Sequence, residues 1–270
     1  MNFDDEYFGT EAQNALMRRG RDLYQLVRAD PRLAFHGRSI ILLGDRGAET
    51  APLMARIARL CGASAIHFYP SEKTEALEAE LTGLGQNAAH WELCTGGRQA
   101  YETCKALLAD VPLPGDLRLE RLSADSPAAL VRATADLSMD CGVMPMPGRQ
   151  MRGLANPGLC LVAVDASGAP VATGSSYRYT HPDSDYRDYA FWGVLATRPD
   201  RRGQKLAMII GANAIVRMWE EFGMRGFTTG VKADNAASMA VCARQGVRPS
   251  GQNFIACTNP EHFGDAPITR

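Results

Sequence analysis

A basic turn that contains glycine stands between a predicted strand and a predicted helix in the second half of the chain. The strand covers 189–197, and Arg198-Pro199 ends it, because proline donates no backbone hydrogen bond and disfavours a helical residue before it. The turn reads Asp200-Arg201-Arg202-Gly203, and apolar residues at helical spacing begin at Leu206. The free N–H groups of a first helical turn and the helix dipole attract anions. The stretch therefore predicts an anion site, with an ordinary strand-to-helix connection as the alternative.

The same stretch resembles a known cofactor loop. Arg202-Gly203-Gln204-Lys205-Leu206-Ala207, preceded by Thr197-x-Pro199, is similar to the acyl-CoA pyrophosphate loop of the GCN5-related N-acetyltransferases (GNATs). That family has the pattern Gln/Arg-x-x-Gly-x-Gly/Ala, and Arg202 and Ala207 match its first and last places. Lys205 stands where the family usually has glycine. Lysine fits there if the backbone keeps a right-handed helical φ, and its charge can then face a phosphate.

A second motif follows after the next predicted strand. The stretch from Asn235 to Val247 reads NAASMAVCARQGV and resembles the late helix of the family, whose pattern is Asn-Ala-x-Ala/Ser, an apolar turn, Tyr, and Gly-Phe at the exit. Asn235 is a good helix cap, and Gly246 is a good C-terminal stop. With two motifs in the family's order and separation, the chain is identified as a member of the GNAT superfamily.

The resemblance implies transfer of an acetyl group from acetyl-CoA to the primary amine of a small molecule, by direct attack in a ternary complex. It places the oxyanion on backbone N–H groups where strand 189–197 splays open, and the pyrophosphate on the N–H groups of 203–208. No metal is expected. The residues expected to bind acetyl-CoA are Leu195, Ala196, Thr197, Arg202, Gly203, Gln204, Lys205, Leu206, Ala207, Asn235 and Ser238.

The acid that protonates the departing thiolate is often a tyrosine of the late helix in this family, and Cys242 holds that place here. Asn235, Ser238 and Cys242 are spaced so that they share one helical face. Either the Cys242 thiol donates the proton, or Cys242 is a small buried residue and Ser238 or water completes the site. An acyl-Cys242 intermediate is disfavoured, because no histidine lies nearby in the sequence to activate the thiol.

The base that deprotonates the incoming ammonium is less well defined. Asp188 opens the splayed strand and is the first candidate, with Asp185 and His181 before it. Asp140 and Cys141 near the expected acceptor loop are further candidates. Each is also compatible with a solvated turn residue, and many family members need only an ordered water.

Net charge and cysteine content indicate which partners and which cellular compartment to expect. The 270 residues carry a formal net charge of −1, which gives no strong field for nucleic acid or an anionic membrane. Seven cysteines without paired spacing favour a reducing cytoplasm, and the acidic start of the sequence is unlike a signal peptide. A homodimer stays open, because family members often dimerise.

The expected architecture is an α/β fold with a mixed α+β sheet. A GNAT domain over 116–270 follows a smaller N-terminal α/β domain over 1–110, and the Pro/Gly-rich linker 111–115 joins them. The N-terminal block is interpreted as a degenerate GNAT-like copy or as a packing or dimerisation domain. Its Gly44-Asp45-Arg46-Gly47 lacks the spacing of a phosphate loop and predicts a plain turn.

The periodicity of apolar residues predicts the individual elements. Helices are expected within 1–35, from about 48 to 60, and over 71–84, 101–108, 126–140 and 203–222. Strands are expected at 39–43, 65–69, 117–122, 159–165, 170–179, 188–197, 227–231 and 248–257. The segment 141–153 is irregular, and the family resemblance places it over the acceptor pocket.

Two other functions stay open. The first is transfer of a longer acyl group, which depends on the volume of the pocket. The second is a sensor or structural module that binds acyl-CoA without turnover, because Lys205 and Cys242 depart from the family pattern.

Overall fold

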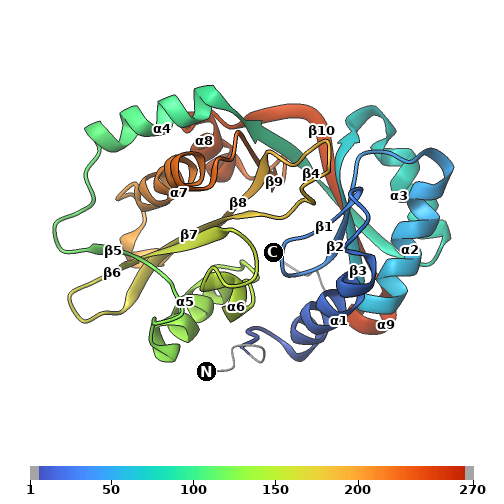
Figure 1. Cartoon of the computed structure of the whole chain (residues 1–270), viewed down its shortest axis with the longest axis horizontal. Helices are drawn as coiled ribbons and strands as arrows, with labels where there is room; N and C mark the ends of the chain where they lie inside the picture. Colours follow the sequence, from blue (N-terminus) through green and yellow to red (C-terminus); the bar gives the residue numbers. More distant parts are fainter. Residues whose placement is uncertain (1–5, 265–270) are drawn as a thin grey trace.

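One mixed sheet runs through both halves of the chain. The computed structural model describes residues 6–264. The strands are β1 (Leu33–Phe35), β2 (Ile40–Leu43), β3 (Ala63–Pro70), β4 (Asn87–Gly96), β5 (Arg118–Arg121), β6 (Gly158–Val164), β7 (Pro170–Arg178), β8 (Tyr189–Thr197), β9 (Gly226–Val231) and β10 (Arg248–Thr258). Within the described residues these ten strands form one sheet in the order β1-β2-β3-β10-β4-β9-β8-β7-β6-β5 (Figure 1). The predicted α/β class with a mixed sheet is confirmed.

Helices cover the sheet in two groups. They are α1 (Glu11–Val27), α2 (Thr50–Cys61), α3 (Thr74–Gly83), α4 (Arg98–Asp110), α5 (Ala128–Asp140), α6 (Gly148–Met151), α7 (Leu206–Phe222), α8 (Ala236–Arg244) and α9 (Pro260–Phe263). Figure 1 shows α1, α2, α3 and α9 around one end of the sheet and α4 to α8 around the other. No helix within residues 6–264 is long and apolar enough to span a membrane.

The two halves of the chain repeat one order of elements. The first half (residues 6–110) runs β1-β2-α2-β3-α3-β4, and the second half (residues 116–264) runs β7-β8-α7-β9-α8-β10. In each run an antiparallel pair leads through a helix to a parallel strand, and a second helix leads to an antiparallel strand. The first half is therefore a second copy of the fold, as the first of the two interpretations expected.

The halves exchange their last strands. β10 of the second half lies between β3 and β4, and β4 of the first half pairs with β9. Helix α4, which follows β4, packs against α7 of the second half. The ring of its Tyr101 stacks on Trp219 of α7, with 4.8 Å between the ring centroids. Residues 111–115 form the irregular connection from α4 to β5. The domain limits 1–110 and 116–270 stay a prediction, and the sheet is continuous across them.

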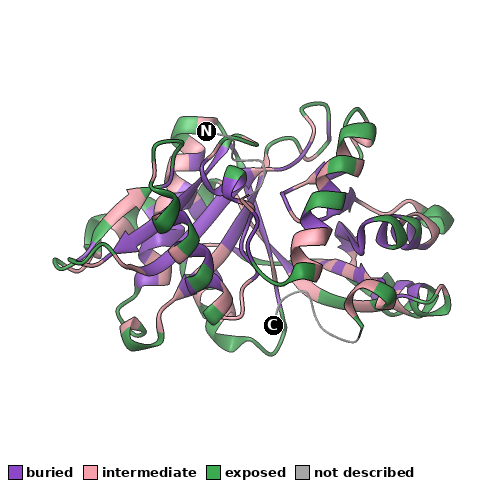
Figure 2. Cartoon of the chain, turned by 90° about the horizontal axis from the view of Figure 1, so that it is seen from below, coloured by how far each residue is buried: buried purple, intermediate pink, exposed green. Residues whose placement is uncertain are grey.

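The core also joins the halves. Ile41 and Ala65 of the first half share one cluster of buried side chains with Tyr177 and Phe191 of the second. Figure 2 shows this buried material along the strands, with exposed residues on the outer helices. This shared cluster of buried side chains consequently joins the two copies.

Several expectations from the sequence differ from the structure. Residues 33–35 were included in a predicted helix but form strand β1, because α1 already ends at Val27. Strand β4 was not predicted, because its first residues include the exposed Asn87 and His90 and it lacks a clear apolar alternation. Helix α1 begins only at Glu11, where Thr10 and Gln13 form a capping box, and residues 1–5 of the predicted helix lie outside the described part. After the last predicted strand the chain forms the short α9, for which no helix was predicted, and residues 265–270 lie outside the described part.

Candidate functional site

Strands β8 and β9 open into a wedge. They pair in parallel only as far as Phe191 and Thr228, and the remainder of β8 has no partner on that side. On its other side β8 pairs with β7, except for a bulge in which Val194 and Leu195 lie opposite Gly174. Val194 has a positive φ of 54°, which few β-branched residues adopt. The bulge leaves two residues outside both ladders at the mouth of the wedge.

The basic turn follows the open end of β8 and leads into α7. Within the described chain, the N–H groups of Gly203, Gln204 and Lys205 donate to no backbone carbonyl. Lys205 has a φ of 62°, so the condition of a right-handed φ is not met at this position. Glycine adopts this left-handed conformation without strain, whereas the lysine here carries the strain.

Two hydrogen bonds hold the start of α7 in place. The indole Nε1 of Trp192 donates to the carbonyl of Gly211 at 3.1 Å. The side-chain Nε2 of Gln245, which follows α8, donates to the carbonyl of Met208 at 2.6 Å. The first turn of α7 is thereby fixed against both β8 and α8.

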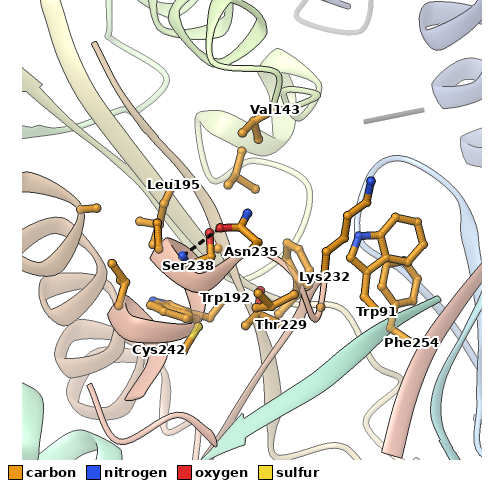
Figure 3. Close-up of a pocket in the computed structure, with 18 of the residues that line it drawn as sticks. Trp91, Val143, Trp192, Leu195, Thr229, Lys232, Asn235, Ser238, Cys242 and Phe254 are labelled. Atoms are coloured by element: carbon orange, nitrogen blue, oxygen red, sulfur yellow. Dashed lines mark hydrogen bonds between the residues drawn. The ribbon is translucent and has the colours of Figure 1, made fainter. Parts of the chain in front are cut away.

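A cavity of about 990 Å³ runs from the turn through the wedge to the first half of the chain. Figure 3 shows Ser238 and Cys242 toward one end and Trp91 and Phe254 toward the other. Among the described residues that line it, no Asp or Glu occurs. The cations that line it are Arg38, Arg201, Arg202, Lys205, Lys232 and Arg244.

The cavity contains buried polar atoms that lack a hydrogen-bond partner among the described residues. Near the turn these are Thr197 Oγ1 and Arg201 Nε, and in the first half they are His36 Nδ1 and Arg38 Nε. A buried polar atom without a partner is unfavourable. The described structure thus leaves two pairs of enclosed polar atoms unsatisfied beside the cavity, one pair in each half of the chain.

Solved structures share the overall fold of this chain. A tandem GNAT protein from the clavulanic acid biosynthesis pathway aligns with a TM-score of 0.54 at 17% identity, over 79% of this chain and 70% of that one. The GCN5-related N-acetyltransferase from Kribbella flavida aligns at 0.54 and 16%, over 91% and 95%. The chain has the GNAT fold. A GCN5-related N-acetyltransferase-like protein from Streptococcus suis aligns at 0.51 and 16% identity, over 84% and 82%. No protein-family model matches the sequence, and no curated protein matches it.

Most of the residues predicted to bind acetyl-CoA line the GNAT cavity. They are Leu195, Thr197, Arg202, Gly203, Lys205, Leu206, Ala207, Asn235 and Ser238. Two do not line it. Ala196 is buried and pairs with Thr173 of β7, and the side chain of Gln204 is exposed.

Helix α8 and its cap place Asn235, Ser238 and Cys242 on one face, which lines the cavity. The side chain of Asn235 caps the helix by accepting from the Ser238 N–H at 3.0 Å, and Ser238 and Cys242 both line the cavity (Figure 3). The neighbouring Cys94 thiol of β4, together with burial, raises the pKa of Cys242 far above that of a free thiol. The same interaction lowers the pKa of Cys94. Burial and the raised pKa favour a packing role for Cys242.

The structure does not bring the candidate bases together with α8. Asp188 has an exposed side chain ahead of β8 and does not line the cavity. The other candidates also do not line the cavity; they are Asp185, His181, Asp140 and Cys141. His36 is the one histidine among the described lining residues, and burial and the nearby Arg38 charge hold its pKa well below the usual value. It is therefore uncharged at neutral pH.

Lining residues that the sequence did not predict include His36, Arg38, Trp91 and Phe254. The rings of Trp91 on β4 and Phe254 on β10 stack 4.9 Å apart and form an apolar wall. These strands become neighbours only through the exchange between the halves. No local motif could have identified this wall.

The first copy of the fold has no comparable site. Strands β2 and β3 stay paired along the whole of β2, so no wedge opens. At the start of α2, Asp45 accepts from the Gly47 N–H at 2.9 Å and from the Thr50 hydroxyl at 3.0 Å, and it binds Lys73 at 2.7 Å. A carboxylate of the chain closes the place where an anion would bind. The prediction of a plain turn at 44–47 is confirmed.

The described chain contains no candidate metal site. No group of three or more His, Cys, Asp or Glu residues between 6 and 264 is arranged to hold a metal ion.

Proposed function

We propose that the chain is an N-acetyltransferase that moves an acetyl group from acetyl-CoA to the primary amine of a small molecule, by direct attack in a ternary complex. The cavity supports this most strongly, because it joins the wedge to the start of α7 and is lined by six cations and no described acid. A helix N-terminus with free N–H groups and neighbouring cations suits a pyrophosphate.

The donor would lie along the second half of the chain. The N–H groups of 203–208 and the side chains of Arg202 and Lys205 would hold the pyrophosphate. Asn235 and Ser238 would line the pantetheine arm from α8.

The residues of the wedge would assist the reaction. Backbone N–H groups at the Val194–Leu195 bulge would stabilise the oxyanion that forms when the amine attacks the thioester. No described carboxylate lines the cavity, so removal of the ammonium proton falls to the neutral imidazole of His36 or to an ordered water. Ser238 or water would protonate the departing thiolate.

Two alternatives have specific support. A binding module without turnover is favoured by the raised pKa of the Cys242 thiol, which the neighbouring Cys94 thiol and burial produce. A longer acyl group is favoured by the cavity volume of about 990 Å³ and by the apolar wall of Trp91 and Phe254.

The compartment and partners belong to the same proposal. All seven cysteines are unpaired, which suits a reducing cytoplasm. The acceptor would be a small molecule, and the chain would bind neither nucleic acid nor membranes. It could act as a monomer or as a homodimer.

The test is release of free thiol from acetyl-CoA by the full chain, against amino acids, polyamines and aminoglycosides. Release with one class of amine supports the enzyme and names its acceptor. Thermal stabilisation by CoA without release for any amine favours the binding module. Release only with longer acyl-CoA donors favours the second alternative.

A further inference from the structure

Arg38 lies at the acceptor end of the cavity with most of its hydrogen-bonding capacity unused. It is in the loop between β1 and β2, and one terminal nitrogen donates to the carbonyl of Met144. Its Nε is fully buried and has no partner. A guanidinium offers five N–H donors in a planar fork that matches a carboxylate. Nε is enclosed, and among residues 6–264 the second terminal nitrogen of this fork has no hydrogen-bond partner.

The charge of Arg38 is not balanced within the described chain. No ion pair with Asp or Glu forms at this side chain, and no described acid lines the cavity. Burial lowers the pKa of Arg38 to about 10, so the guanidinium stays charged at neutral pH. A buried cation without a counter-ion is costly, and an anionic ligand removes that cost.

Arg38 lies close to the wedge in the fold. Its neighbour in the loop, His36, packs edge-on against Phe191 with ring centroids 5.0 Å apart. Phe191 is the last residue of β8 that pairs with β9, so the loop borders the place where the amine must attack. Trp91 and Phe254 line the same cavity and offer an apolar surface.

We propose that the acceptor amine carries a carboxylate, that Arg38 binds this carboxylate, and that the apolar wall receives an apolar side chain. The substrate class is then an apolar or aromatic amino acid. This inference rests on the proposed acetyl transfer. It disfavours polyamines and aminoglycosides, since polycations would meet six cations and no described acid.

The experiment compares amino acids with their carboxamides as acceptors, which differ only in the anionic group. Glycine, leucine and phenylalanine are measured with their amides on the full chain, on Arg38→Gln, on Arg38→Lys and on a control, Arg32→Gln. Arg32 is an exposed arginine of the same half that pairs with Asp30 and does not line the cavity.

The wild-type chain is expected to prefer an acid over its amide by about tenfold or more in kcat/KM. Arg38→Gln should remove this preference by raising KM for the acid alone, and Arg38→Lys should keep part of it. Equal use of acid and amide by the wild type overturns the proposal. An equal loss for both acceptors in Arg38→Gln also overturns it, because Arg38 then only holds the Met144 segment.

A measurement without turnover separates this inference from the proposed function. Binding of N-acetylphenylalanine and its amide to the CoA-saturated chain is measured by calorimetry. Arg38-dependent preference for the acid without any turnover supports the carboxylate site and contradicts acetyl transfer. Turnover of amines without a preference for acids contradicts the carboxylate site alone, and absence of both binding and turnover contradicts both.

Discussion

The imidazole of His36 packs edge-on against the phenyl ring of Phe191, with 5.0 Å between the ring centroids. His36 belongs to the first copy of the fold, and Phe191 ends the paired part of β8 in the second. The contact brings the β1–β2 loop to the wedge. The first copy, which has no wedge or open anion site of its own, therefore forms a wall of the site in the second.

Replacement of Gly174 by alanine is expected to disturb the bulge in β8. A Cβ at this position would lie 2.6 Å from Leu195 Cδ2 and 2.8 Å from Ile210 Cγ2. Overpacking of this kind costs about 1–3 kcal/mol of unfolding free energy. Chemical denaturation should show this loss, and calorimetry should show weaker CoA binding.

The matched control for this change is Gly83→Ala in α3, where an added Cβ meets no atom within 4 Å. It should stabilise the chain slightly, because alanine is the better helix former. Unchanged stability and CoA affinity in Gly174→Ala would mean that the bulge is not held by this close approach.

Replacement of Lys205 by glycine is expected to stabilise the chain and to weaken CoA binding. The left-handed backbone of Lys205 costs roughly 1 kcal/mol more for lysine than for glycine. The free energy of unfolding should rise by about that amount, while loss of the charge lowers the affinity for CoA. Gln204→Gly is the control, since its backbone is not left-handed and glycine should not stabilise it. A loss of stability in Lys205→Gly would contradict this.

Replacement of Cys242 by alanine is expected to leave catalysis nearly intact. The neighbouring Cys94 thiol and burial raise the pKa of this thiol, which makes it a poor acid. The kcat should change by less than about threefold, whereas Ser238→Ala should lower it by about tenfold. If Cys242→Ala instead lowers kcat more than Ser238→Ala at unchanged CoA affinity, the thiol is the acid.

Acid should destabilise the chain through its buried histidines. Burial lowers the pKa of His67 from 6.5 to about 3, and its Nδ1 lies 3.0 Å from the hydroxyl of Tyr179. The unfolded chain binds a proton below about pH 6.5 and the folded chain does not until about pH 3. Stability should therefore fall as pH falls through this window, by roughly 1 kcal/mol per pH unit for such a histidine.

His36, whose pKa is also lowered by burial, acts in the same direction. Denaturation at a series of pH values should show a shallower fall for His67→Gln than for the wild type. His90→Gln, at a partly exposed position, is the control. An unchanged slope for His67→Gln would show that His67 is not buried in its neutral form.

Short-range sequence patterns predicted most elements of the second half of the fold. The Asn235 cap, the hairpin before β8 and the basic turn all follow from residue types at short range, and the structure confirms these elements. The fold class also followed, because the two motifs carry the element order with them.

The far wall of the site could not be derived in this way. Trp91 and Phe254 are neighbours only because the halves exchange strands, and Arg38 lies far from the wedge in sequence. Long-range pairing of this kind leaves no periodicity in the chain. The conformation of Lys205 was also missed, because residue type alone does not reveal that the fold imposes a left-handed φ there.

We propose that the turn after β8 binds the pyrophosphate of CoA. Calorimetry of CoA binding to the full chain tests it most directly, with Arg202→Glu combined with Lys205→Glu against the wild type. Arg56→Glu with Arg248→Glu is the control, since both arginines are exposed and lie outside the cavity. We expect a loss of CoA affinity of more than about tenfold in the turn variant and almost none in the control. An unchanged CoA affinity in the turn variant would contradict the account.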